Sequence, residues 1–244
     1  MSQEQGGIVA WVGFPEWVRG PSRVVDGEII LDENRAERYV PDLLDRAIFE
    51  LAAASDYQDF RAFVRRYGLL WHGPNSLGTG ECRESISEWQ EAVYEANVIV
   101  LLYMKLREAE RTGSADPLRS LNMTWQGMPE TSNDEVYLKQ ISTGLAGLIN
   151  NHVAQYPMVL IPAFRFEEKA PPGEFVFGRQ PPNLQKALYT NLATIIGQRA
   201  ELKECVGCGR LFHPESGKQK YCTKSCASTS RWHRWKEQQS KQSS

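Results

Sequence analysis

Four cysteines near the C-terminal end have the spacing of a metal site. The segment CVGCGRLFHPESGKQKYCTKSC holds Cys205 and Cys208 with two residues between them, and Cys222 and Cys226 with three residues between them. The glycines of the first pair allow backbone amides to fold around both sulfurs, and the second pair spans one helical turn, so that Cys222 can precede a helix. Four converging thiolates form a closed tetrahedral site for one structural Zn²⁺, with no open position for a catalytic water.

The alternative is that these cysteines are incidental or form disulfides. Closely spaced cysteines in a reducing compartment more often hold a metal. The start MSQEQGG lacks a basic stretch followed by an apolar one, and the run VIVLLYM is too short to cross a bilayer. We therefore expect a cytoplasmic protein. The isolated Cys82 is expected to be buried and inert.

A basic, tryptophan-containing segment, ASTSRWHRWKEQQSK, follows the last cysteine without a helix breaker. A helix over it would gather cations along one broad side, as phosphate binding requires. Its tryptophans could stack on bases or clamp the helix to the rest of the protein, and a basic helix face can also be merely solvated. The expected nucleic-acid contacts are Lys218, Lys220, Lys224, Arg231, Trp232, Arg234 and Lys236.

Charge is distributed unequally along the chain. Residues 201–244 contain nine Lys or Arg and four Glu, a net charge of +5, whereas the whole chain carries −2. The first 200 residues therefore carry −7. This asymmetry indicates a tail that faces a polyanion, attached to an acidic body.

Other catalytic signals are weak. The spacing of Arg66 and His72 in RYGLLWH matches the R-x5-H pattern of HEPN-type ribonucleases, but Gly68 is expected to end the helix between them. A nuclease built on the zinc-binding frame would have only His213 and His233 nearby. We find no convincing active site and do not expect an enzyme.

The body that positions the tail, residues 1–200, is predicted to be mainly helical with small β hairpins. With 41% hydrophobic and 24% charged residues, the 244-residue chain can bury a sizeable core. IVAWVGF and RVVDGEIIL are expected to form strands with a DG turn, and SDYQ is expected to act as a capping box that starts a helix ending at Gly68.

Further along the body, SISEW opens a long helix that ends at Gly113. A helix follows over residues 134–155, then strands in MVLIPAFRFEE and EFVFG joined by KAPPG, and a last helix that leads directly into the first cysteine. Residues 201–244 then form a finger docked on the body. The expected parts of the finger are a CVGCG knuckle, a hairpin from Leu211 and Phe212 through ESGK to Tyr221, and the basic helix. The predicted fold class is α+β with a treble-clef-like finger.

The cysteine segment resembles the C-terminal zinc finger of bacterial CGNR-type proteins, which are thought to regulate transcription. The shared motifs are C-x2-CG-x2-F and KYC-x3-C, and FRAFVRRYGLLW resembles segments of the mainly helical body of those proteins. Where the tetrapeptide that names the group would begin, at Cys226, this chain reads CAST. The resemblance implies zinc ligation by the four cysteines, whereas the regulatory role on DNA is expected from the charge asymmetry and the metal site.

Two functions follow from these observations. The first is a DNA-binding transcription regulator whose acidic body senses a ligand or forms a homodimer. The alternative is a protein-interaction module, such as an antitoxin or a complex subunit, whose zinc finger is purely structural and binds a partner protein.

Overall fold

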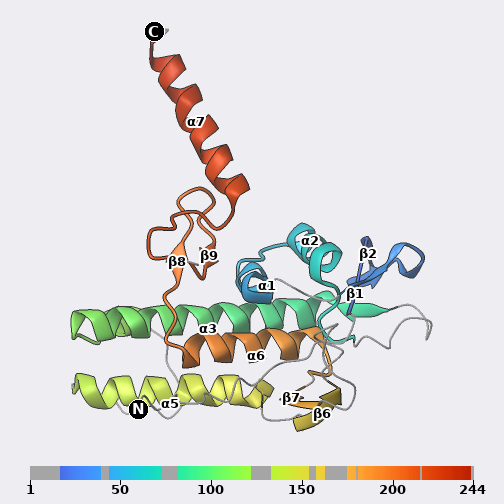
Figure 1. Ribbon diagram of the computed structural model, residues 1–244, viewed down its shortest axis with the longest axis horizontal. Coiled ribbons are helices and arrows are strands. Elements are labelled where there is room, and N and C mark those ends of the chain that lie inside the picture. The colour runs from blue at the N-terminus through green and yellow to red at the C-terminus, as the bar shows by residue number, and fades with distance from the viewer. Residues whose placement is uncertain are drawn as a thin grey trace.

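The protein has a mixed α+β fold that is mainly helical, as predicted (Figure 1). The computed structural model describes residues 17–39, 44–72, 82–121, 133–153, 158–162, 175–179, 181–214 and 216–242. The helices are α1 (Leu44–Ala52), α2 (Tyr57–Tyr67), α3 (Ile86–Thr112), α4 (Asp116–Arg119), α5 (Asp134–Val153), α6 (Leu184–Gly197) and α7 (Lys224–Gln242). The strands are β1 (Trp17–Arg19), β2 (Ser22–Val25), β3 (Glu28–Leu31), β4 (Glu37–Tyr39), β5 (Arg83–Ser85), β6 (Met158–Pro162), β7 (Phe175–Arg179), β8 (Lys203–Glu204) and β9 (Leu211–Phe212).

The strands form small antiparallel sheets. The DG turn predicted in RVVDGEIIL joins β2 to β3, and Asp26 and Gly27 both have positive φ angles, 50° and 79°, as a two-residue hairpin turn requires. Strand β5 pairs with the other edge of β3, β1 pairs with β4, and β6 pairs with β7 as expected. The predicted IVAWVGF strand and the KAPPG turn lie outside the described residues.

Helix α3 is the centre of the body. It begins with a capping box between Ser85 and Glu88 and ends at Gly113, whose φ is 71°. Helices α1, α4 and α5 contact it, and α6 contacts both α1 and α5, so that α3, α5 and α6 run alongside one another (Figure 1). Its apolar residues enter the core of the body, with Trp89, Ile99, Val100 and Leu102 buried.

Helix α2 ends where the sequence predicted but has a different N-cap. It ends at Gly68, which has a φ of 94° that favours glycine. Its N-cap, however, is Asp56 and not Ser55, because the Asp56 carboxylate accepts hydrogen bonds from the backbone N–H groups of Gln58 and Asp59. The N–H and hydroxyl of Ser55 instead donate to the Asp59 carboxylate, and these bonds hold the pKa of Asp59 below its ordinary value. The predicted capping box in SDYQ is therefore wrong, because Asp56 and not Ser55 caps the helix.

The Glu84 carboxylate organises the chain after α2. It is buried and accepts hydrogen bonds from the backbone N–H groups of Leu70, Trp71 and His72 and from the indole of Trp89, at 2.6 to 3.2 Å. The Nδ1 of His72 also lies 3.0 Å from this carboxylate. A buried acidic side chain thus fixes a segment that has no regular secondary structure.

The R-x5-H pair is divided between two structural interactions. Arg66 forms an ion pair with Glu50 at 2.8 Å, while His72 pairs with Glu84. Gly68 ends the helix between them, as the sequence predicted. Each side chain therefore has its own structural partner.

The C-terminal finger packs on the body. The hydroxyl of Tyr103 in α3 donates a 2.7 Å hydrogen bond to the carbonyl of Ala200, just before β8. Strand β9 contacts α1, Leu211 packs against the hydrophobic core of the body, and Phe212 is only 2% exposed. These contacts agree with the expectation of a docked finger.

None of the helices in the described part of the chain is both long and apolar enough to cross a membrane.

Candidate metal centre and the adjoining helix

The first pair of cysteines lies in a tight turn between β8 and β9. Lys203 pairs with Phe212 across the two strands. Within the turn, the Cys205 N–H donates to the Arg210 carbonyl and the Gly209 N–H donates to the Cys205 carbonyl, both at 2.8 Å. This is the predicted knuckle, and it carries the two sulfurs on one short loop.

The hairpin of the finger differs from the predicted one. Its strands are β8 and β9, on either side of the knuckle, and the described residues after Phe212 form no strand that reaches Tyr221. Residues 216–219 form a separate turn in which the Gln219 N–H donates to the Ser216 carbonyl. The knuckle closes the hairpin because its own backbone hydrogen bonds bring the two strands into register.

The second pair of cysteines lies at the start of α7, as predicted. Cys222 precedes the helix and Cys226 is its third residue. The hydroxyl of Thr223 accepts a hydrogen bond from the Cys226 N–H at 3.0 Å and so caps the first turn. The start of α7 is thereby aimed at the knuckle.

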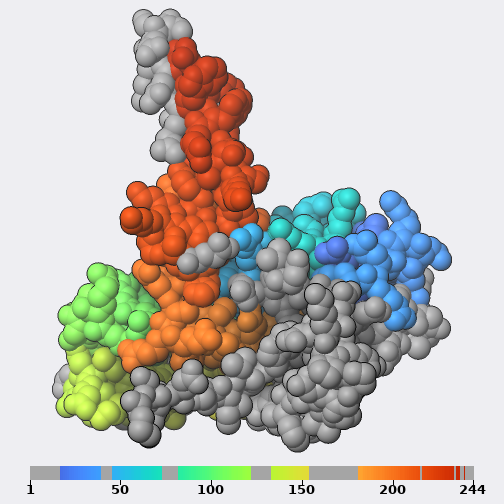
Figure 2. Space-filling view, in the orientation of Figure 1, coloured from blue at the N-terminus to red at the C-terminus, as the bar shows by residue number. Residues whose placement is uncertain are grey.

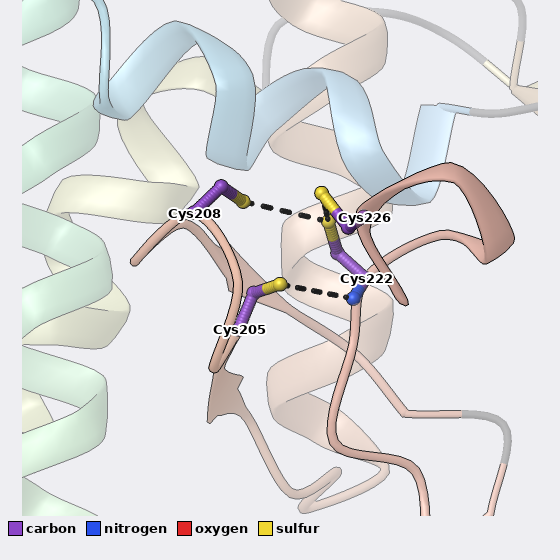
Figure 3. A group of neighbouring side chains, drawn as sticks. All are labelled: Cys205, Cys208, Cys222 and Cys226. Atoms are coloured by element: carbon purple, nitrogen blue, oxygen red, sulfur yellow. Dashed lines mark hydrogen bonds between the residues drawn. The ribbon is translucent and has the colours of Figure 1, made fainter. Parts of the chain in front are cut away.

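The four sulfurs converge from these two places (Figure 3). Their Sγ atoms all lie within 4.8 Å of one another, with 3.7 Å between Cys208 and Cys222 and 3.5 Å between Cys222 and Cys226. In a tetrahedral site with metal–sulfur bonds of about 2.3 Å, neighbouring sulfurs lie about 3.8 Å apart. All four cysteines are free thiols. The cluster therefore has the geometry and donor set to hold a metal ion.

Burial, hydrogen bonds and crowding shift the pKa values of Cys205, Cys208 and Cys222 in different directions. Burial disfavours the Cys205 thiolate, but the backbone N–H groups of Cys222, Gly207 and Cys208 outweigh it and lower the pKa of Cys205 to about 6. Burial and the neighbouring thiols raise the pKa values of Cys208 and Cys222. A cation at the centre would stabilise the thiolates and so offset the burial and the crowding that favour the protonated thiols of Cys208 and Cys222.

Gly207 allows the knuckle to approach α7 closely. A Cβ atom at this position would lie 3.1 Å from the carbonyl oxygen of Cys226 and 3.4 Å from the ring of Tyr221. A side chain at residue 207 would push the two halves of the cysteine cluster apart.

Beyond the cysteines, α7 projects away from the body (Figure 2). Trp232 and Trp235 are 52% and 58% exposed. The alternative in which they clamp the helix to the body is therefore wrong. The ammonium group of Lys236 lies 5.2 Å from the centre of the Trp232 ring, so that a cation and an aromatic face are presented together.

The residues predicted to contact nucleic acid lie on α7 or in the turn that precedes it. Arg231 and Lys236 are exposed on α7, and Arg234 belongs to the same helix. Three lysines share an open depression of about 360 Å³ at the start of α7, a clustering that sequence spacing did not reveal. No ion pair engages these lysines, Arg231 or Lys236 within the described ranges. The three lysines are Lys218, Lys220 and Lys224.

The histidines near the finger do not join the metal cluster. Across the part of the chain that the structure describes, the only group of potential metal ligands that comes together is the set of four cysteines. His213 is half-buried in the loop after β9, and His233 is exposed on α7 with its ring in an edge-to-face arrangement with that of Trp232.

Taken together, the fold and the site define a mainly helical α+β protein with a C-terminal four-cysteine cluster arranged as in a zinc finger. Comparison of the chain with family models, with curated proteins and with solved structures finds no match.

Proposed function

We propose that this is a zinc-finger nucleic-acid-binding protein that acts on DNA as a regulator. The observation that carries the proposal is the projecting helix α7, which exposes two tryptophans among cations that have no acidic partner within the described residues. Solvent-exposed tryptophans on a basic helix are the chemical complement of bases and phosphates.

The metal in this proposal is one Zn²⁺ bound by the four cysteine sulfurs. Its role is architectural, since sulfur fills every position of a tetrahedral site. Binding the metal fixes the start of α7 against the knuckle, and through β8 and β9 against the body. Folding of the finger and binding of the metal are then one equilibrium.

The charge of α7 supports phosphate binding. Residues 224–242 contain five Lys or Arg and one Glu, a net charge of +4 over a helix about 28 Å long. A cationic surface of this density attracts nucleic acid by releasing counterions, so affinity should fall steeply with salt. The acidic body would be repelled by the same polyanion, and we assign it to sensing a ligand or to forming a dimer.

The resemblance of the cysteine segment to CGNR-type fingers supports the same proposal. Proteins of that type are thought to regulate transcription, and here the finger supplies both the metal scaffold and the projecting basic helix. The motif residues involved are the four cysteines, Gly209 and Phe212.

The test is a binding assay with matched charge reversals. Labelled duplex DNA, single-stranded DNA and RNA are titrated with the intact protein and with a double variant, Arg231→Glu with Lys236→Glu, at low and moderate salt. The control variant, Arg65→Glu with Arg111→Glu, makes the same change in net charge at exposed positions of the body. We expect the α7 variant to lose binding and the control to retain most of it.

Failure of the intact protein to bind any of the three nucleic acids at low salt would refute the proposal. The exposed apolar side chains Trp232, Trp235 and Val206 would then favour the alternative, a finger that docks a partner protein. Charge reversal on α7 need not disturb such an apolar contact.

A further inference from the structure

The depression at the start of α7 has the composition of a phosphate site. It has a volume of about 360 Å³, and Lys218, Lys220 and Lys224 line it together with Tyr221 and Thr223. Among the described residues that line it, none is acidic. Three positive charges around one small opening favour a compact anion, because each ammonium adds to the same local potential.

This lysine depression lies on the same side of α7 as an exposed tryptophan. Lys224, Arg231 and Trp235 are separated by seven and then four residues, which places them along one line of the helix. Trp232 lies about 60° further around the helix than Trp235, and Lys236 follows Trp232 one turn later with its ammonium over the indole ring. The line from the lysines therefore reaches Trp235, and Trp232 presents a second indole beside it.

We infer that this surface binds a single-stranded nucleic acid, with one backbone phosphate in the lysine depression and unpaired bases stacked on Trp232 and Trp235. The inference rests on the proposed function and narrows its substrate. An indole face can stack only on a base whose own face is open, and in a duplex the bases already cover one another. A ligand that contacts phosphate by lysine alone would not need the two exposed indoles.

The length of the surface sets the spacing between the two contacts. Lys224 and Trp235 are eleven residues apart, which corresponds to about 16 Å along the helix. That distance matches about five nucleotides of a strand stacked at about 3.4 Å per base, and fewer nucleotides of an extended strand. The phosphate in the depression and the stacked bases therefore belong to different nucleotides of one short segment.

The experiment uses the intact, metal-loaded protein and a fluorescent single-stranded oligonucleotide. A series of oligonucleotides carries one neutral methylphosphonate linkage at successive positions, and a second series carries one abasic nucleotide. With the unmodified protein, we expect the neutral linkage to weaken binding more at one position of the strand than at the neighbouring positions. We expect an abasic nucleotide to weaken binding most when it lies within about five nucleotides of that position.

Variants connect each effect to its residues. The triple variant Lys218→Gln, Lys220→Gln, Lys224→Gln should bind the unmodified strand more weakly and should no longer distinguish the sensitive linkage from its neighbours. Trp232→Ala and Trp235→Ala should each weaken single-strand binding roughly five- to 150-fold, and each should leave the sensitive linkage in place. All these side chains are on the surface, and circular dichroism with metal analysis confirms that each variant is folded.

The outcomes separate this inference from the proposed function. If a duplex of the same sequence binds as tightly as the single strand and the tryptophan variants bind normally, the inference is overturned while nucleic-acid binding stands. A neutral linkage that has the same effect at every position would overturn the phosphate site. If none of the nucleic acids binds at low salt, the proposed function itself fails.

Discussion

Removal of the metal should destabilise the body as well as the finger. The perturbation is chelation of the purified protein, with Cys226→Ser as the genetic equivalent. Without the metal, the knuckle is held to the start of α7 mainly by hydrogen bonds such as that from the Cys222 N–H to the Cys205 sulfur, and the small finger has little core of its own. Strand β9 would then leave α1, the body would lose the packing of Leu211 against its core, and the buried Phe212 would become exposed.

The size of the effect follows from the side chains that become exposed. Burial of one Leu or Phe side chain stabilises a protein by about 1.5 to 3 kcal/mol. Phe212 is 2% exposed but Leu211 is only half-buried, so we use the lower limit for both, about 3 kcal/mol in total. For a chain of this size, each kcal/mol lowers Tm by about 2 to 4 °C. The Tm of the body should therefore fall by about 6 to 12 °C.

The assay is thermal unfolding followed by far-ultraviolet circular dichroism, which is dominated by the body helices, with metal content measured by elemental analysis. The intact protein should hold one zinc per chain. Cys226→Ser should have the lowered Tm and should not respond to chelator. Cys82→Ala is the control, because Cys82 is buried in the body and should leave the metal and the response to chelation intact. Loss of the metal with a change in Tm of less than about 2 °C would show that the finger folds independently of the body.

Three further predictions concern single residues. Glu84→Gln should lower the free energy of unfolding, measured by urea titration, by about 3 kcal/mol or more. The reason is that the NH₂ group of the amide would face N–H donors such as the Trp89 indole, which the carboxylate accepts from. A change below about 1 kcal/mol would contradict this role of the carboxylate. Gly207→Ala should weaken zinc binding in a competition assay with a colorimetric chelator, since its Cβ would press on the Cys226 carbonyl, and an unchanged zinc affinity would show that the finger can adjust. The lowered pKa of Asp59 means that its carboxylate stabilises the fold above the ordinary value of 3.8 and that this contribution is lost as the pH falls through the lowered pKa. The stability difference between the intact protein and Asp59→Asn should therefore shrink on acidification below 3.8, and a constant difference across that range would be inconsistent with this interpretation.

Local signals in the sequence determined much of the secondary structure. The DG turn, the long helix that ends at Gly113 and the helix that ends at Gly68 all appear where glycine geometry and hydrophobic spacing predicted them. Caps and strand pairs depend on competition between neighbours, and this is where prediction failed. Asp56 displaced Ser55 as the N-cap, and the knuckle closed the hairpin that had been expected further along the finger.

The sequence by itself also determined which four cysteines come together, since a pair of cysteines in a glycine-rich turn and a second pair one helical turn apart are the spacing of a metal site. Only the tertiary structure decided how the finger presents its surface. Periodicity cannot say whether Trp232 and Trp235 face the body or solvent, because the direction of α7 depends on how the knuckle and β9 pack against α1. Spacing likewise could not show that three lysines meet in one depression, since that depends on the path of the turn between β9 and α7.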